Sequence, residues 1–240
     1  MALNNMKTAT ITFHAPNNNG SFLQAYALQK YITTHFDNVE NEIIDFQPES
    51  QQQQYAIFRK IHSKKDILRN LISFWHYKAL SKRFLAFSEM REKYLKMTKR
   101  CTTTEEAIKI AGNYDLVIAG SDQIWNTTAR DFSEAFFLPG ISKKSTYAVS
   151  CGSHLNEVDC DRICSAMETF ENVSVREIDT REFLEKHTKR SIETVLDPAF
   201  LLTKEDYSGL YDKERILKEK YIFLYTINYD EDALKQTVRV

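Results

Sequence analysis

The strongest constraint on the fold is a regular alternation between short β-rich runs and helical patterns along the chain. Residues 21–34 and 103–111 have helical patterns, and Glu106 and Gly112 give the second helix a capping box and a stop. Strand-like runs fall at residues 8–14, 41–46, 116–119, 145–150, 173–176, 193–196 and 221–227. Strands that alternate with helices predict βαβ units, so we expect an α/β fold with a parallel sheet and helices on both faces.

The composition is that of an ordinary globular chain. With 240 residues, 42% of them apolar, and a formal net charge of −1, it can bury a full core as one large domain or as one domain and a fragment. The sequence has no run of about 18 apolar residues that could cross a bilayer, and its first residues lead directly into a strand pattern. We therefore expect a cytoplasmic protein.

The four cysteines have no CxxC spacing, and a chain of this length does not need disulfides, so reduced thiols are expected. Cys160 and Cys164 stand four residues apart on a predicted helix, with His154 just upstream. Three soft ligands could meet there, but no fourth ligand is evident, and helix packing explains the spacing. We expect neither a metal nor a cofactor.

Two segments interrupt the alternation. Residues 47–54 are polar and glutamine-rich, which predicts a linker in the form of a surface loop. Within a helical insertion expected at 55–100, residues 59–100 contain thirteen Lys or Arg residues against three acidic ones. This stretch is about ten charges positive, and the rest of the chain is about eleven charges negative.

Aromatic residues are interleaved with the basic residues of 59–100, namely Phe74, Trp75, Tyr77, Phe84, Phe87 and Tyr94. Such a stretch can bind nucleic acid, a membrane surface or an anionic substrate. The alternative is an amphipathic helix pair with its aromatics on the core and its lysines in solvent. Because the rest of the chain is acidic, we expect no nucleic-acid partner. The functional interpretation is a docking face for an anionic, lipid-linked glycan, with peripheral contact at the inner face of the membrane.

Compact polar turns follow five of the predicted strands, at residues 14–21, 120–126, 150–154, 176–177 and 197–198. Ligands of open parallel sheets bind at the carboxyl ends of the strands, where helix N-termini present free N–H groups. In the first turn, Asn18 lies beside Gly20, which allows close backbone approach, and Ser21, which can cap a helix. A simple βα turn is the alternative. No GxGxxG or GxxxxGK[ST] motif occurs, which argues against a dinucleotide and against ATP hydrolysis.

The segment VIAGSDQIWN at 117–126 holds a carboxylate, two amides, a hydroxyl and an indole after an apolar strand. Asp122 could act as a general base or bind a sugar hydroxyl, and Trp125 could stack on a pyranose ring. Alternatively, Asp122 caps a helix and Trp125 fills the core. The candidate substrate-binding residues of this turn are Gly120, Ser121, Gln123, Trp125 and Asn126.

Three further residues complete the candidate site. Arg176 ends a strand, and its guanidinium suits a carboxylate or a phosphate, although pairing with Glu177 is an equal alternative. His14 is either a catalytic acid–base group or a hydrogen-bonded histidine of the core. Gly152 is expected in the same crevice as Gly20, Asp122 and Trp125, because the carboxyl ends of parallel strands lie along one edge.

Six segments in this order and at similar spacing resemble the polysaccharide pyruvyl transferase family over residues 8–203: ITFHAPNNNGSFLQAYALQKYI, NEIIDF, YDLVIAGSDQIWN, KKSTYAVSCG, SVRE and VLDPAFLL. The resemblance implies a GT-B-like architecture, with two Rossmann-like domains facing across a cleft. It also implies a bacterial transferase of exopolysaccharide or capsule synthesis. Such an enzyme uses phosphoenolpyruvate as donor substrate and a glycan or lipid-linked oligosaccharide as acceptor.

The resemblance further implies that residues 1–204 are the first Rossmann-like domain and that 205–240 begin a second domain that is not completed. A Phe-His-Gly motif of the family's second domain does not occur in this sequence. We therefore expect a chain that is inactive by itself and that associates through the edge of its last strand. The alternatives are a GT-B-like glycosyltransferase using a nucleotide sugar and a non-catalytic glycan-binding module.

Overall fold

A computed structural model describes residues 5–152, 157–211, 219–221 and 231. The chain divides into two compact units, Met1–Thr203 and Lys204–Val240. The described start of the second unit consists of turns, with Ser208 donating its backbone N–H to Glu205 and Leu210 donating to Tyr207. The strand predicted at 221–227 lies almost wholly outside the described residues.

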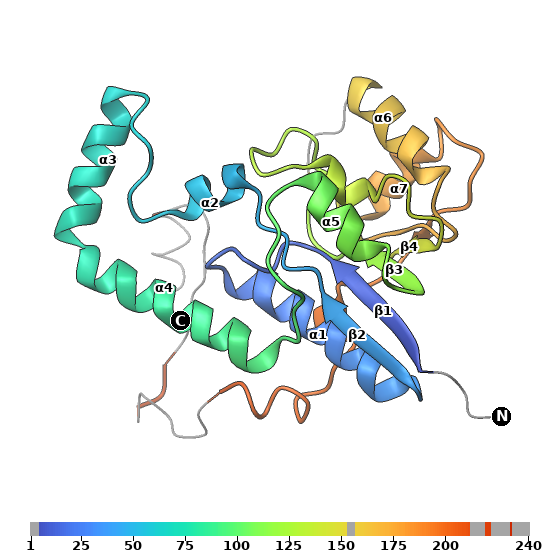
Figure 1. Cartoon of the computed structure of the whole chain (residues 1–240), viewed down its shortest axis with the longest axis horizontal. Coiled ribbons are helices and arrows are strands. Elements are labelled where there is room, and N and C mark those ends of the chain that lie inside the picture. Colours follow the sequence, from blue (N-terminus) through green and yellow to red (C-terminus); the bar gives the residue numbers. More distant parts are fainter. Residues whose placement is uncertain (1–4, 153–156, 212–218, 222–230, 232–240) are drawn as a thin grey trace. The chain divides into compact units, whose positions relative to one another are not determined.

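The first unit is built on a four-stranded, all-parallel sheet in the order β2-β1-β3-β4 (Figure 1). Its strands are β1 (Met6–Ile11), β2 (Val39–Ile43), β3 (Leu116–Ala119) and β4 (Lys144–Thr146). A second parallel pair is formed by β5 (Ser174–Val175) and β6 (Glu193–Thr194). Single bridges from Val149 to Asp122 and to Val175 connect this pair with the main sheet. The predicted parallel α/β sheet is confirmed, although most strands are shorter than predicted.

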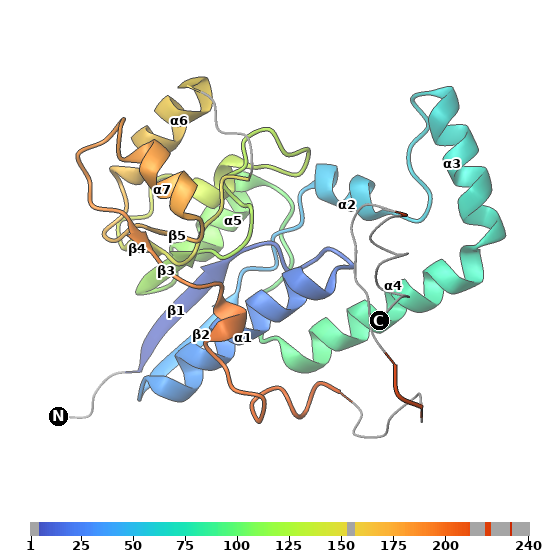
Figure 2. The same cartoon turned by 180° about the vertical axis from the view of Figure 1, so that it is seen from behind.

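Helices cover both faces of the sheet. Figures 1 and 2 show α1 (Asn19–His35) on one face and α5 (Thr104–Ala111) on the opposite face. The predicted capping box of α5 is present, because Thr103 and Glu106 cap each other's backbone, and the helix ends at Gly112. The chain continues through η1 (Glu134–Phe137), α6 (Glu157–Met167), α7 (Ile178–Leu184) and η2 (Pro198–Phe200), the last of which packs against α1.

The surface loop predicted at residues 47–54 is wrong, because most of this segment forms helix α2 (Glu49–Tyr55). Pro48 sits at the N-cap with extended backbone angles, and Glu49 places a negative charge in the first turn, where the helix dipole favours it. Glutamine has a long unbranched side chain and good intrinsic helix propensity. The glutamine run therefore continues the helix, and Gln51 is buried.

The basic stretch forms two helices, α3 (Lys64–Trp75) and α4 (Tyr77–Tyr94), as its pattern predicted, and Figure 1 shows that they meet at an open corner; we call them the α3–α4 helix pair. The end of α4 packs on the domain, where the ring of Tyr94 lies 6.5 Å from Phe22 and 6.3 Å from Tyr26. At the other end the aromatics do not reach the core, since Phe74 is 67% exposed and Trp75 is 78% exposed. The interpretation of 59–100 as a helix pair with its aromatics on the core is therefore wrong for the α3–α4 corner.

Lys144, at the start of β4, is a cation buried in the core. Its Nζ donates to the backbone carbonyls of Phe137 at 2.9 Å and Leu138 at 2.6 Å, and lies 4.6 Å from the ring centroid of Phe170. Burial lowers the pKa of Lys144 to about 8, because the apolar surroundings disfavour the charged form.

We predict that Lys144→Met changes how stability depends on pH. Between the folded pKa of about 8 and the ordinary value of 10.5, the unfolded chain holds a proton at Lys144 that the folded chain has lost. The contribution of Lys144 to the free energy of unfolding therefore rises with pH through this window, by up to about 3 kcal/mol. Urea unfolding at pH 7.5, 9 and 10.5 should show a shallower rise for Lys144→Met than for the wild type. If the free energy of unfolding rose equally with pH in the two proteins, the lowered pKa of Lys144 would be contradicted.

Candidate functional site

The carboxyl ends of β1 and β3 bring two of the predicted turns into direct contact. Ser21 Oγ, in the first turn of α1, donates to Asp122 Oδ2 at 3.0 Å. Beneath them, Thr12 Oγ1 donates to the Ser121 carbonyl at 2.7 Å. The helix is capped by Asn18 and not by Ser21, because the Asn18 side chain accepts from the Gly20 N–H at 2.8 Å. The hydroxyl of Ser21 is thus available to hold Asp122.

Asp122 is a carboxyl group in a largely desolvated position. Burial raises its pKa, against the lowering effects of the Gln123 N–H, the Ser21 hydroxyl and the charge of Arg176; Asp197 raises it further. The Gln123 N–H donates to Asp122 Oδ1 at 2.8 Å. A carboxyl whose pKa is raised and whose orientation is fixed by two donors has the properties of a general base.

Gly120, just before this turn, is a position where only glycine fits. Its φ of +137° lies in a region that other residues rarely adopt, and a Cβ there would lie 2.0 Å from the Tyr147 carbonyl oxygen. Gly152 is similar, with a φ of +76° and a Cβ position 2.5 Å from Asn126 Nδ2. Gly152 and Asn126 are therefore neighbours, and the turn after β4 lies against the turn after β3.

Arg176, after β5, is held by two acids. Its Nε donates to Glu177 Oε1 at 3.0 Å, and its Nη1 donates to Asp197 Oδ2 at 2.8 Å. The predicted alternative of a pair with Glu177 is thus present, and the guanidinium also raises the local positive potential felt by Asp122. All five predicted turns contribute to one connected edge of the sheet.

Two predicted roles do not agree with the structure. Trp125 is 0% exposed, its Nε1 donates to the Phe136 carbonyl at 3.3 Å, and its ring packs against Phe137 and Phe170. Its face is not accessible to a sugar, so stacking on a pyranose is wrong for this residue. Ser121 is also fully buried, and its hydroxyl donates to the Ala148 carbonyl at 2.9 Å. Gln123 is exposed and Asn126 is half-buried at the same turn.

His14 belongs to the core and not to the reacting surface. It is 1% exposed, its Nε2 lies 2.9 Å from Asp45 Oδ1, and its Nδ1 lies 3.2 Å from the Thr12 carbonyl. A catalytic acid–base role for His14 has no path to a substrate, because both ring nitrogens face buried partners. Burial alone would raise the pKa of Asp45, but contacts with His14, Gln47 and Arg100 hold it at about 2.

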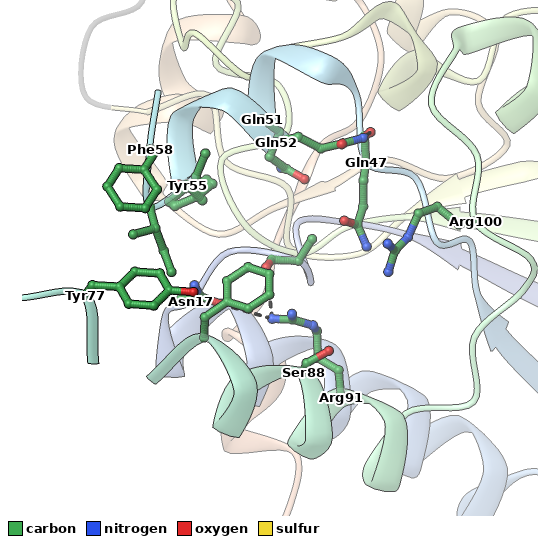
Figure 3. Close-up of a pocket in the computed structure, with 14 residues that line it drawn as sticks. Asn17, Gln47, Gln51, Gln52, Tyr55, Phe58, Tyr77, Ser88, Arg91 and Arg100 are labelled. Carbon is green, nitrogen blue, oxygen red and sulfur yellow. Dashed lines mark hydrogen bonds between the residues drawn. The ribbon is translucent and has the colours of Figure 1, made fainter. Parts of the chain in front are cut away.

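A pocket of about 530 Å³ lies beside this edge, between α2 and α4 (Figure 3). The sequence analysis missed it, because its walls come from the segments interpreted as a linker and a basic insertion. We call it the arginine pocket; its main polar residues are Asn17, Gln47, Gln51, Gln52, Tyr55, Ser88, Arg91 and Arg100. The one signal for this pocket in the sequence is the frequent occurrence of arginine and glutamine in these two segments.

Tyr55 connects the arginine pocket with the strand-end turns. Burial raises the pKa of this pocket residue, and the carboxylates of Asp131 and Asp122 raise it further. The pKa of Asp131 is itself raised by burial, although a hydrogen bond from the Gln51 side chain opposes the rise. The pocket and Asp122 also share the turn after β1, because Asn17 lines the pocket and Ser21 of the same turn donates to Asp122 at 3.0 Å.

Comparison with known proteins agrees with the motifs of these turns. The sequence profile described as Polysaccharide pyruvyl transferase matches residues 18–239. The chain belongs to the polysaccharide pyruvyl transferase family. This match contains Asp122, Arg176 and both helices that wall the arginine pocket. No curated protein and no solved structure matches the chain.

The described residues of this pyruvyl transferase family member contain neither a metal-ligand cluster nor a membrane-spanning helix. No group of three His, Cys, Asp or Glu side chains there is arranged to hold a metal ion. Cys160 Sγ lies 3.6 Å from Cys164 Sγ on α6, and His154 lies outside the described residues. No described helix combines the length and the apolar character needed to cross a bilayer.

Proposed function

We propose that this protein transfers the pyruvyl group of phosphoenolpyruvate to two hydroxyls of one sugar in a bacterial exopolysaccharide or capsule, with release of phosphate. The unit Met1–Thr203 is the Rossmann-like acceptor domain of a GT-B-like enzyme, and the donor-side domain begins within Lys204–Val240. Family membership supports the transferase class. The observation that carries the proposal is Asp122, a carboxyl group with a raised pKa at the carboxyl edge of the sheet.

The chemistry requires a base at the acceptor. A sugar hydroxyl loses its proton and bonds to C2 of phosphoenolpyruvate, while the CH2 carbon takes a proton and becomes a methyl group. Phosphate then leaves with the electron pair of its C–O bond. A second hydroxyl bonds to C2 and loses its proton, which ends on the departing phosphate. We assign to Asp122 the removal of the first hydroxyl proton, because Ser21 and the Gln123 N–H fix its orientation.

We expect Asp122→Asn to lower the rate of phosphate release from phosphoenolpyruvate by about 10²- to 10⁴-fold, the range of a lost general base. Because the chain is predicted to be inactive by itself, the assay uses the purified chain both alone and extended by the second domain of a family member, with a panel of methyl pyranosides as acceptors. Asp115→Asn is the matched control, because Asp115 is exposed at the amino end of the same strand and binds only the Lys7 N–H at 2.8 Å. Phosphate release that is equally fast in Asp122→Asn and Asp115→Asn would refute the role of Asp122.

We also propose that the α3–α4 helix pair docks on an acidic membrane surface, where a lipid-linked acceptor would be presented. The support is the exposed apolar content of a strongly basic segment. Apolar side chains anchor such helices at the lipid boundary, and clustered lysines add attraction to anionic lipids. The exposed apolar residues of the helix pair are Ile67, Leu68, Leu71, Ile72, Phe74, Trp75, Tyr77, Phe84 and Leu85.

Charge reversal tests this docking. Changing Lys64, Lys65, Lys78 and Lys82 to Glu should weaken binding to phosphatidylglycerol-containing vesicles, most strongly at low salt. Arg83 is left intact, because its Nη2 donates to the Asn17 carbonyl at 2.8 Å. The control reverses four exposed lysines outside the helix pair: Lys109, Lys143, Lys186 and Lys189. Equal vesicle binding by the two variants in a sedimentation assay would exclude the helix pair as the docking surface.

A further inference from the structure

We propose that the arginine pocket is a binding site for a phosphorylated sugar. This proposal rests on the proposed function, because the ligand is the anionic end of the acceptor. Its volume of about 530 Å³ suits a sugar with one or two phosphates. The pocket is lined by none of Ser21, Asp122 or Arg176, so it is separate from the proposed base.

Two guanidinium groups at the same end of the pocket supply the anion site (Figure 3). Arg91 is only 7% exposed, and its Nη1 donates to two neutral acceptors, the Ala15 carbonyl at 2.9 Å and Asn17 Oδ1 at 3.5 Å. Among the described residues Arg91 forms no ion pair with a carboxylate. A buried cation of this kind is costly unless an anion accompanies it.

Arg100 makes the local positive charge larger. Its Nε donates to Asp45 Oδ2 at 3.1 Å, but Asp45 is also the partner of His14. Burial lowers the pKa of Arg91, and the neighbouring charge of Arg100 lowers it further, although Asp45 opposes this. Two guanidiniums that repel each other at one end of a pocket are stabilised by a dianion, and their planar N–H groups match phosphate oxygens.

The opposite end of the pocket suits a sugar ring. Phe58 and Tyr77 are stacked, with ring centroids 5.8 Å apart, and Phe84 lies in the same wall. Each of the three is 41% to 52% exposed. Aromatic faces present an apolar surface on which the C–H face of a pyranose can lie. Inorganic phosphate alone would leave this wall unused.

Between the two ends, amide oxygens are available for hydroxyl donors. Gln47 uses its Nε2 to donate to Asp45 Oδ1 at 2.6 Å, and Gln52 uses its Nε2 to donate to the Gln47 carbonyl at 2.7 Å. The Oε1 atoms of these pocket residues remain as acceptors, which sugar hydroxyls complement. A phosphate at the arginines, hydroxyls at the amides and a ring on the aromatics together define the ligand class.

The turn after β1 gives the site a place in the reaction, because it holds both Asn17 of the pocket and Ser21, which donates to Asp122. A sugar chain bound through its phosphate at Arg91 and Arg100 would extend along this turn toward the proposed base. Holding the acceptor by a group remote from the reacting hydroxyls is an efficient use of binding energy. Phosphoenolpyruvate carries both a phosphate and a carboxylate, so it is the competing ligand that the test must separate.

The test is isothermal titration calorimetry of the full chain with α-D-glucose 1-phosphate, methyl α-D-glucoside, inorganic phosphate and phosphoenolpyruvate, each alone. We expect glucose 1-phosphate to bind at least about tenfold more tightly than the other three, because only this probe uses both ends of the pocket. Glucose 1-phosphate binding no tighter than inorganic phosphate would overturn the proposal. Tighter binding of phosphoenolpyruvate would also overturn it, since the pocket would then be a donor site.

Variants locate the binding. Arg100→Gln should weaken glucose 1-phosphate binding about tenfold or more, while Arg130→Gln, an exposed arginine outside the pocket, should leave it unchanged. Tyr77→Ala should weaken glucose 1-phosphate binding without affecting inorganic phosphate. Arg100, Arg130 and Tyr77 are all exposed, so the variants should fold, and comparison with the wild-type circular dichroism spectrum provides the check. Unchanged affinity in Arg100→Gln would overturn the assignment.

These titrations contain no second substrate, so they separate this proposal from the proposed function. If the chain bound glucose 1-phosphate, but neither the chain alone nor the chain extended by a family second domain released phosphate from phosphoenolpyruvate with any acceptor, the transferase proposal would be contradicted and the pocket proposal would stand. Phosphate release without glucose 1-phosphate binding would contradict the pocket proposal and leave the transferase proposal in place.

Discussion

Parallel pairing of β1 with both β2 and β3 is the constraint on which the rest of the site depends. Ile11 pairs with Ala119 and Thr10 with Ile43, so the turns after all three strands emerge at one edge. From this register follow the hydrogen bond between Ser21 and Asp122 and the contact of His14 with Asp45. Residues that are about a hundred positions apart in the sequence thereby form one surface.

Position divides the buried polar residues of this domain into two groups. Lys144 donates to backbone carbonyls and His14 contacts Asp45, so both have their partners in the core. Asp122 lies instead at the carboxyl edge of the sheet, and Arg91 lines the arginine pocket. Burial shifts the pKa of each against its charged form, and groups of this kind beside a site are those that a substrate can use, whether as a base or as an anion site.

Much of the fold could be predicted from the sequence, because alternating strand and helix patterns and the Thr103–Glu106 capping box are local signals. The candidate site was less predictable. Trp125 follows a polar turn, and only packing against Phe137 and Phe170 shows that it belongs to the core. The arginine pocket forms from helices α2 and α4 and the first turn, and no local pattern reports a contact between segments so far apart.

The central claim is that Asp122 is the base of a pyruvyl transfer to a sugar, and the pH dependence of kcat/KM for phosphoenolpyruvate tests it most directly. Because the base must be deprotonated, activity should fall as the pH is lowered through the pKa of Asp122, which burial raises above the ordinary value of 3.8. Ser21→Ala removes a hydrogen bond that lowers this pKa, so it should move the acidic limb of the profile to higher pH. An acidic limb at the same pH in Ser21→Ala and in the wild type would contradict the account.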